Sequence, residues 1–369
     1  MLVFLNIIIL IAMFAFFIFS IWYTAFRLHT HFCSIPFWTL QIIVAICAIG
    51  SFFALIITSR FSSQFVSFIN ILSGYVLLFI IFLFIILVIA HIINRIWSFP
   101  LLLSGISALA VAFIITIVGA ILGASFFVKE TEIKISNLEN ELTIMQISDV
   151  HIGHHRRHDY LAKIVEETNK RNPDLVLITG DLIDAAPALL QGVLEPLSNF
   201  KAPVYFVEGN HEIDVVRERA LNLIAQQGVH ILHNEVTETH GIQLIGLEYM
   251  KADENTFDMH PSENTATIKS VLAQLSIKSD VPSILIHHSP VGIQYIESTG
   301  IDLMLSGHTH AGQVFPFSLF SKLSFPFNSG LYQQGKTKIF VSNGAGTFMV
   351  RVRLGSFNEI NLLKLIPND

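Results

Sequence analysis

The formal charges of this chain lie almost entirely in its second part, and this distribution constrains the fold more than any other feature. Residues 1–128 contain no Lys, Asp or Glu. The only formally charged side chains there are Arg27, Arg60 and Arg95. The other 19 of the 22 basic residues and all 28 acidic residues lie in 129–369. A solvated domain needs charged surface residues, which a membrane bundle excludes. The sequence therefore predicts a membrane region followed by a globular domain, with a boundary near Lys129.

Four uncharged runs in the first region are long enough to cross a bilayer, which takes about 20 apolar residues in a helix. They occupy residues 2–26, 37–58, 69–90 and 101–128. The first run has no basic residue before it and no small-residue cleavage site after it, so we expect a retained anchor rather than a signal peptide. Four spans place the N-terminus and the globular domain on the same side. Arg27 and Arg95 balance Arg60 and Lys129, so the positive-inside rule gives no orientation.

Charge and cysteine usage exclude two classes for residues 129–369. The balance of 19 basic and 28 acidic residues gives a formal charge of −9. A nucleic-acid binder needs a basic face to follow phosphates, so no nucleic-acid partner is expected. Both cysteines, Cys33 and Cys47, lie in the membrane region, which excludes a disulfide scaffold in the globular domain. The oligomeric state cannot be read from the composition.

Short apolar runs alternate with amphipathic segments in the globular domain. Strands are expected at 132–138, 142–148, 175–179, 204–207, 230–232, 242–247, 283–286, 303–305, 339–342 and 359–365. Helices are expected at 159–172, 215–227 and 265–275. This alternation predicts an α/β domain in which helices cover the sheets.

Five polar clusters each follow an apolar strand. They are Asp149-Val150-His151, Gly180-Asp181-Leu182-Ile183-Asp184, Gly209-Asn210-His211-Glu212, His287-His288-Ser289-Pro290 and Gly307-His308-Thr309-His310. Ligands bind at strand ends in open α/β sheets. Carboxylate, imidazole and amide oxygen are ligands of divalent metals. An extended backbone would project both side chains of Asp149-x-His151 to the same side, and likewise those of His308-x-His310. Five such clusters in order predict a metal site rather than polar loop ends.

These clusters resemble the motifs of the calcineurin-like metallophosphoesterase superfamily over roughly residues 142–365. The resemblance is greatest to its bacterial membrane-associated branch, whose last motif continues into Gln, as Gly307–Gln313 does here. Ala311 stands where that branch usually has Gly. Further matches to the branch are Gly330-Leu331-Tyr332, Val341–Thr347 and Arg351. The resemblance implies a four-layer α/β/β/α sandwich after the four transmembrane helices.

The same resemblance implies a di-metal site. The ligands of one metal would be Asp149, His151 and His310. Those of the other would be Asn210, His288 and His308. Asp181 would bridge the two metals, and His211 would be the catalytic imidazole. Asp184 would orient a ligand or His211. The family's His-x-Pro spacing selects His288 over His287.

Two divalent ions are therefore the expected cofactors. Mn suits this donor set best, with Fe or Zn as alternatives. Such a pair would hold a bridging hydroxide that attacks a phosphodiester or phosphomonoester, and would stabilise both the attacking and the leaving oxygen. A protonated His211 would stabilise the developing charge or protonate the leaving oxygen. Protein Ser/Thr phosphatases of this superfamily carry an Arg after the second motif. Gly180–Ala186 lacks it, so a phosphoprotein substrate is not expected.

Three functions are compatible with the sequence. The leading interpretation is a membrane-anchored phosphoesterase that acts at the bilayer surface, with a lipid-linked phosphate as a candidate substrate. One alternative is hydrolysis of a soluble nucleotide or sugar phosphate by a tethered domain. The other is a catalytically idle membrane sensor, which the intact ligand set and His211 disfavour. The resemblance implies a cytoplasmic membrane protein with its catalytic domain on the outer face.

Two segments are candidates for the rim of the site. His154–His158 follows the first motif, and its Arg156 and Arg157 could bind a distal phosphate or an anionic headgroup; the alternative is a solvated loop.

The other candidate is residues 314–327, which hold five Phe and two Leu, with Lys322 as the only charge. Pro316 and Pro326 disfavour a regular helix or central strand across this segment. Its Phe315, Phe317 and Phe320 could form a lip that enters the bilayer interface. The alternative is that they fold back as a small core.

Overall fold

The structure is a computed structural model that describes residues 2–256 and 265–368, with the side chains of residues 2–10 left out of the description. The chain divides into two units, and each is described separately. The first comprises residues 1–58 and 64–121, and the second comprises residues 59–63 and 122–369.

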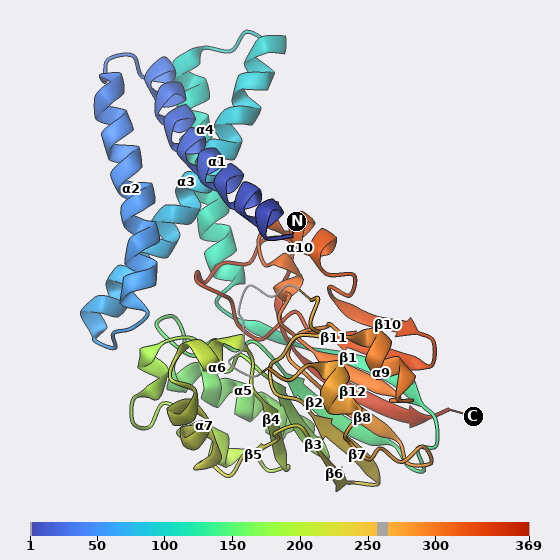
Figure 1. The fold of residues 1–369 in the computed structure, drawn as a ribbon. Helices are drawn as coiled ribbons and strands as arrows, with labels where there is room; N and C mark the ends of the chain where they lie inside the picture. The colour runs from blue at the N-terminus through green and yellow to red at the C-terminus, as the bar shows by residue number, and fades with distance from the viewer. Residues whose placement is uncertain (1, 257–264, 369) are drawn as a thin grey trace. The chain divides into compact units, whose positions relative to one another are not determined.

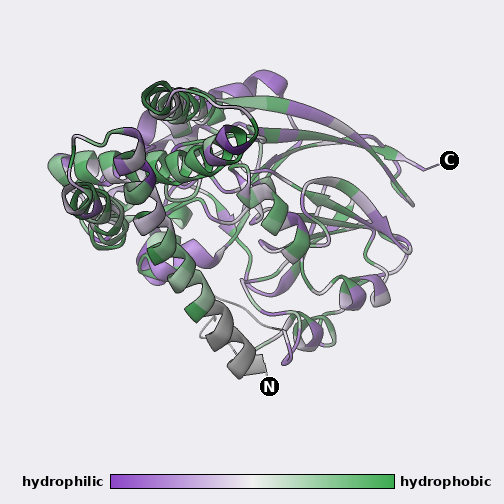
Figure 2. Ribbon diagram, turned by 90° about the horizontal axis from the view of Figure 1, so that it is seen from above, coloured by the Kyte–Doolittle hydropathy of each residue, from purple (hydrophilic) through white to green (hydrophobic). Residues whose placement is uncertain are grey.

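Four helices make up the first unit (Figure 1). They are α1 (Leu2–His31), α2 (Phe37–Thr58), α3 (Gln64–Ile96) and α4 (Leu101–Leu122). Each is long and apolar enough to cross a membrane, and Figure 2 shows hydrophobic residues along most of their length. The predicted membrane region is therefore present, and the chain is a membrane protein.

Polar side chains inside the first unit pair with one another across helices. Asn70 of α3 donates a hydrogen bond to the Thr58 hydroxyl of α2, at 2.8 Å. Asn94 of α3 donates to Ser104 of α4, at 3.0 Å. Hydrocarbon offers no partner for such groups, so pairing across helices both satisfies and orients them.

The second unit contains two mixed six-stranded sheets. In the first, the strand order is β1-β12-β2-β3-β4-β5. Its bounds are β1 Phe126–Ile135, β12 Asn358–Pro367, β2 Leu142–Ile147, β3 Leu175–Thr179, β4 Val204–Val207 and β5 His230–Ile231. In the second, the order is β10-β11-β9-β8-β7-β6. Its bounds are β10 Gly330–Gln334, β11 Thr337–Val341, β9 Leu303–Ser306, β8 Ser283–Ile286, β7 Ile242–Gly246 and β6 Glu235–Thr239. Strands β2 to β5 run parallel, as do β7, β8, β9 and β11.

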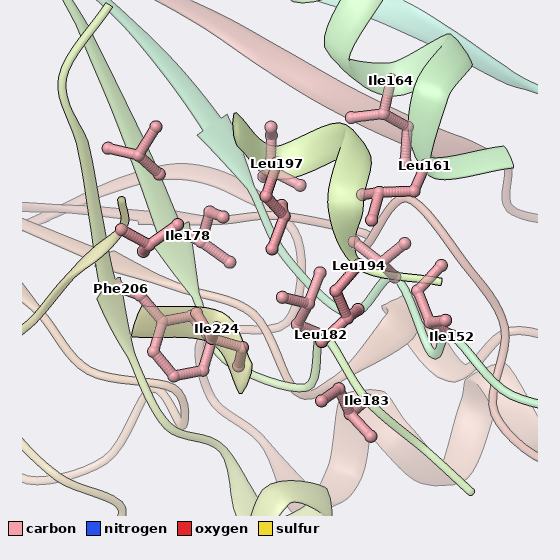
Figure 3. Packing of buried hydrophobic residues seen from close by; sticks show 14 of the residues in the cluster. Ile152, Leu161, Ile164, Ile178, Leu182, Ile183, Leu194, Leu197, Phe206 and Ile224 are labelled. Atoms are coloured by element: carbon pink, nitrogen blue, oxygen red, sulfur yellow. The ribbon is translucent and has the colours of Figure 1, made fainter. Parts of the chain in front are cut away.

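Alternating side chains of each central strand enter two different cores. Leu175 and Leu177 of β3 pack between the two sheets, whereas Val176 and Ile178 face the helices outside the first sheet. Helices α5 (His158–Arg171) and α7 (Arg217–Ala225) contribute to that outer core, part of which Figure 3 shows. Helices α8 (Ile268–Leu272) and α9 (Ile293–Ser298) cover the second sheet. Burial of both faces explains the continuous apolar runs in the sequence. The predicted four-layer α/β/β/α sandwich is confirmed.

Several predicted boundaries were wrong. Helix α4 ends at Leu122 rather than at residue 128, because Phe126 to Val128 already belong to β1. The C-terminal strand β12 lies between β1 and β2, although these two strands are adjacent in sequence. The predicted helix 215–227 is shorter in the structure: α7 (Arg217–Ala225) begins only after a left-handed Val216, and a separate short helix, α6 (Asn210–Asp214), precedes it.

The segment between the two prolines is helical, but the helix runs through neither proline, in agreement with the prediction. Helix α10 (Phe317–Ser324) has 8 residues and directly follows Pro316. Proline is tolerated at a helix start because the first N–H groups have no partner within the helix. The proline argument holds only for a helix that runs through these positions.

Candidate metal centre

The five polar clusters lie at the carboxyl ends of parallel strands in both sheets. Asp149, Asp181 and Asn210 follow β2, β3 and β4, while His288 and His308 follow β8 and β9. Glycine is needed where these ends meet: a Cβ on Gly180 would lie 2.6 Å from Nδ1 of His288. A Cβ on Gly307 would lie 2.1 Å from the Asp149 carboxylate. The two sheets therefore bring their polar ends to one place.

The expected extended backbone at the paired motifs is wrong. Asp149 and His151 have φ of 51° and 52°, and His308 and His310 have φ of 71° and 50°. All four residues are left-handed, a conformation that costs about 1–3 kcal/mol per residue and persists only where surrounding structure holds it. The regular ladder has already ended at these positions, so tight turns rather than strand alternation bring each pair together.

Asp149, His151 and His310 form the first group of converging donors. The Nε2 atoms of His151 and His310 face each other at 3.0 Å, and Nε2 of His310 lies 3.3 Å from Oδ1 of Asp149. All three side chains are buried. Burial raises the pKa of Asp149 and lowers that of His310 well below its usual value. The backbone N–H of His308 donates to the Asp149 carboxylate at 3.1 Å.

Asp181, His288 and His308 form the second group. Nδ1 of His288 lies 2.8 Å from the Thr179 carbonyl, which can only accept, so this nitrogen carries a hydrogen. Its Nε2 therefore faces Oδ2 of Asp181 at 3.0 Å and Nδ1 of His308 at 3.2 Å. Burial alone would lower the pKa of His288, but the Asp181 carboxylate raises it to about 9.

Asp181, a member of the second group, also approaches the first. Its Oδ2 is 3.0 Å from His288 and 3.9 Å from Nε2 of His151, which belongs to the first group. This is the position that a bridging carboxylate requires. His287 belongs to neither group among the described residues: its Nδ1 contacts the Ser289 carbonyl at 2.7 Å, and burial lowers its pKa to about 4.

His211 points its two ring nitrogens at two carboxylates. Nδ1 lies 3.0 Å from Asp184, and Nε2 lies 4.0 Å from Oδ2 of Asp181. Burial alone would lower the pKa of His211, but Asp181 and Asp184 raise it to about 10. Asp184 also lies 3.5 Å from Nδ1 of His151, so one carboxylate orients both imidazoles. Burial would raise the pKa of Asp184, but these two histidines hold it well below its usual range.

Glu212 supports the loop ends, a role for which the short Gly209–Glu212 spacing is the only sequence signal. Its fully buried carboxylate accepts hydrogen bonds from the N–H groups of Asp181, Ile183 and Gly209 at 3.0, 2.9 and 2.7 Å. Burial, and then the Asp181 charge, raises the pKa of Glu212 to about 7. The residue ties the turn after β3 to the turn after β4.

Arg353 was not identified from the sequence, although Arg351 beside it was. Its buried guanidinium donates to the His310 carbonyl and to the carbonyls of Asn343 and Gly346 at 2.7 Å or less. The loop that carries Gly346 in turn donates its N–H to the Asp149 carbonyl at 2.7 Å. Arg353 thus connects the turns of two predicted ligands through a third segment.

Phe348 is a further unpredicted neighbour of the site. Its ring lies 5.0 Å from that of His211 and 6.1 Å from that of His151, and it remains 39% exposed. The side chain of Gln313 holds this position by accepting from the Phe348 N–H at 2.8 Å. Phe348 places an apolar surface directly beside the charged imidazole.

The predicted rim position of Arg156 is wrong. Its guanidinium is buried and donates to Thr347 and to the Gly123 carbonyl, each at 2.8 Å, and it lies 5.0 Å from the Tyr160 ring. The hydrogen bond to Thr347 draws the Arg156 side chain into the protein, away from solvent. Arg157 is half-buried, and its role at the rim stays a prediction.

Arg156→Gln should therefore reduce stability rather than substrate affinity. We expect a loss of about 1–3 kcal/mol, because the buried Thr347 hydroxyl would lose the donor that Arg156 supplies. Arg157→Gln, the matched control, should change stability by less than about 0.5 kcal/mol. Thermal unfolding of the full chain in detergent, together with KM for an anionic phosphoester, measures both effects. A raised KM with unchanged unfolding in Arg156→Gln would restore the rim assignment.

The predicted lip is exposed. Phe315, Phe317 and Phe320 are 53%, 43% and 64% exposed, and no residue of α10 is buried. The alternative of a small core applies only to the end of the segment, where Phe327 packs on the Tyr332 ring at 5.3 Å.

Changing Phe315, Phe317 and Phe320 together to Ser should leave the free energy of unfolding within about 1 kcal/mol of wild type, since these rings fill no core. Phe327→Ser should cost about 2 kcal/mol or more by removing packed surface. Thermal unfolding of both variants provides the comparison. An unfolded triple variant would show that the three rings are core.

The donor set fits two divalent metal ions. Two carboxylate–imidazole groups converge around Asp181, and pairs of ring nitrogens approach to 3.0 and 3.2 Å. The buried side-chain oxygen of Asn210 has no hydrogen-bond partner among the described residues. An amide oxygen that binds a metal ion would leave its hydrogen-bonding capacity unused in the same way. The Asp184 and Thr179 contacts orient imidazoles in the way that neighbours of metal ligands do.

Comparison with known proteins identifies the family. A sequence model described as calcineurin-like phosphoesterase matches residues 142–312, which include every proposed metal ligand. An uncharacterized metallophosphoesterase of Helicobacter pylori is 39% identical over 246 residues, which cover 66% of this chain and 64% of the relative. A transmembrane protein with metallophosphoesterase domain from Danio rerio is 32% identical over 257 residues, covering 64% of this chain and 57% of the relative.

The chain thus spans less than two thirds of the length of these two relatives. A solved archaeal phosphodiesterase is 15% identical, with a TM-score of 0.34, covering 56% of this chain and 87% of its own. The matched range and the identities of the sequence relatives lead to one conclusion: residues 142–312 of this chain belong to the calcineurin-like phosphoesterase family.

Proposed function

We propose that this protein is a membrane-anchored, metal-dependent phosphoesterase. The observation that carries the proposal is the position of Asp181 between two groups of converging donors, each with two imidazoles. Asp149, His151 and His310 would hold one ion, and Asn210, His288 and His308 the other. Bound there, two divalent ions supply positive charge for the phosphate oxygens and an activated water.

The residues of the chain supply the rest of the reaction. His211 carries a proton at neutral pH, since its pKa is raised to about 10, and its Nε2 faces the side of the site where Asp181 lies. It would donate that proton to the leaving oxygen or stabilise charge on the phosphoryl group. Asp184 holds the imidazole in this orientation through Nδ1. Phe348 packs against the same imidazole, with ring centroids 5.0 Å apart, and would limit the access of water to it.

Activity of the full chain in detergent tests this proposal. Chelated protein should be inactive on a chromogenic phosphodiester and recover on addition of Mn, with Fe and Zn tested in parallel. His288→Asn should bind less metal and lose activity. His287→Asn is the matched control: its imidazole belongs to neither donor group, so metal content should be retained. A metal-loaded wild type with no activity on any phosphoester would favour the idle sensor.

A lipid-linked phosphoester is the substrate class that we propose. Four membrane-spanning helices and the exposed apolar rings of Phe315, Phe317 and Phe320 beside the His310 turn support it. The competing class is a soluble nucleotide or sugar phosphate. Turnover of phospholipid headgroups in proteoliposomes, compared with turnover of soluble nucleotides at equal concentration, separates the two.

We also propose that the protein lies in the cytoplasmic membrane with its catalytic domain on the outer face. The resemblance to the membrane-associated branch supports this orientation. The arginine and lysine residues are balanced between the two sides and favour neither orientation. A C-terminal reporter that is active on only one side of the membrane tests it. Activity of a C-terminal reporter that works only inside the cell would show that the catalytic domain lies on the inner face.

A further inference from the structure

Helix α10 presents an apolar surface that the globular domain does not cover. Phe317, Leu319, Phe320 and Leu323 are 43%, 52%, 64% and 83% exposed. Its remaining residues are three serines and Lys322. Soluble domains rarely leave several large apolar side chains exposed together, and such patches mark contact with a membrane or a partner.

A second exposed apolar pair lies where the chain enters the domain. Phe127 of β1 and Phe357, just before β12, are 44% and 51% exposed, and their rings meet edge to face at 6.0 Å. Phe127 is the second residue of β1, which begins at Phe126. The pair therefore marks the edge of the domain that is nearest in sequence to the last membrane helix.

Backbone contacts join these two features into one surface. The Phe315 N–H donates to the Leu354 carbonyl at 2.8 Å, three residues before Phe357. A Cβ on Gly355 would lie 3.7 Å from Cβ of Phe315, which is itself 53% exposed. Phe315 thus connects α10 to the Phe127–Phe357 pair.

The short connection to α4 indicates what covers this surface. Only residues 123–125 separate the end of α4 at Leu122 from β1. Three residues span at most about 11 Å, so this edge of the domain must remain close to the headgroups. The connection is also held in place, because the Gly123 carbonyl accepts from Arg156 at 2.8 Å and from Asn358 at 3.1 Å. The Phe127–Phe357 pair therefore lies on the edge of the domain that the short connection tethers to the end of α4.

We propose that Phe127, Phe315, Phe317, Phe320, Leu323 and Phe357 form a bilayer-docking surface that inserts into the headgroup–acyl boundary. Lys322, the only charge of α10, would extend its amine to anionic lipid phosphates. The surface adjoins the metal centre, since the Phe325 ring lies 5.5 Å from that of His308 and Ser321 donates to the Thr309 carbonyl at 3.4 Å. Docking would hold the mouth of the site at the depth of lipid phosphates. This consequence for the substrate rests on the proposed function, whereas docking itself does not.

The depth of α10 in a bilayer can be measured without catalysis. Full-length protein with Cys33→Ser and Cys47→Ser would carry Leu323→Cys, labelled with an environment-sensitive fluorophore. It would be reconstituted in vesicles of phosphatidylethanolamine and phosphatidylglycerol that contain acyl-chain spin-labelled lipid. The matched control is His240→Cys, an exposed site on the turn between β6 and β7, at the opposite end of that sheet from His308.

We expect the label at position 323 to be quenched at least three-fold more strongly than the label at 240, with blue-shifted emission. Equal quenching at the two positions would overturn the docking proposal. This result is independent of whether the protein turns over any phosphoester, so it separates a failure of docking from a failure of the proposed function.

A second variant tests the consequence for substrate use. Leu319→Glu combined with Leu323→Glu places two charges at exposed positions of α10, which are 52% and 83% exposed. Turnover of a phospholipid substrate in the vesicles should fall about ten-fold, while kcat on a small soluble phosphodiester should stay within two-fold of wild type. Undiminished phospholipid turnover would overturn the role of the surface in substrate presentation. Thermal unfolding of the variant shows whether the fold is intact.

Discussion

Asp181→Asn is expected to remove bound metal and to reduce phosphoesterase turnover by at least about 100-fold. Loss of a residue that merely orients a metal ligand costs 10–100-fold, so loss of a bridging ligand should reach the upper end or exceed it. The carboxylate is buried, with Oδ2 at 3.0 Å from His288 and 3.9 Å from His151, so both groups would lose a negative partner. Metal content per chain and turnover of a chromogenic diester measure the effect.

The fold should survive this change. Asn has the same shape, and its amide oxygen can still accept the His211 N–H that Oδ1 of Asp181 accepts at 3.0 Å. Asp302→Asn is the matched control, because Asp302 accepts from the Ser283 N–H at 2.9 Å and belongs to no metal group among the described residues. It should retain both metals. Two metals and normal turnover in Asp181→Asn would show that Asp181 is no bridge.

His211→Ala should slow an alkyl phosphoester by about 10²–10⁴-fold and a nitrophenyl ester much less, while both metals stay bound. An alkoxide is a poor leaving group and needs the proton of His211, whereas nitrophenolate leaves without one. Parallel rates on the two esters, with metal analysis, test the assignment. Equal losses on both would instead assign His211 to charge stabilisation on the phosphoryl group.

The pH profile gives an independent check on the same residue. Asp181 and Asp184 raise the pKa of His211, so the imidazolium persists at neutral pH and is lost as pH rises. Alkyl ester turnover should accordingly decline at alkaline pH in wild type, and this limb should disappear in His211→Ala. Asp184→Asn removes the partner 3.0 Å from Nδ1, which lowers the pKa, so the limb should move to lower pH. An unchanged limb in that variant would argue against His211 as its origin.

Features that depend on local pattern were predictable. The four membrane helices follow from uncharged runs of sufficient length, and the two-sheet domain follows from the alternation of apolar strands with amphipathic helices. The polar clusters of the site could be recognised because their carboxylate and imidazole side chains directly follow apolar strands. Asp149, Asp181 and His288 each come directly after buried residues. Parallel strands end at a common edge of the sheet, so motifs that are far apart in the sequence become neighbours in space.

Predictions failed where a contact joins distant segments. Arg156 looked like a rim cation because the residues around it are polar, yet Thr347, far along the chain, accepts its hydrogen bond at 2.8 Å. Arg353 acts on the His310 turn in the same way. No local pattern distinguishes a buried arginine from an exposed one, since the carbonyls that satisfy it are set by the arrangement of loops.

The sequence by itself therefore determined the division into membrane and globular regions, the α/β class and the identity of the candidate ligands. The first two are encoded in composition and short-range periodicity, whereas the candidate ligands follow from the motifs that the chain shares with the phosphoesterase family. Only the tertiary structure decided that β12 lies between β1 and β2, and that left-handed turns aim Asp149 and His151. It also decided that the rings of α10 remain exposed beside the site. These outcomes depend on which distant segments pack together, and packing is a property of the whole chain rather than of any stretch of it.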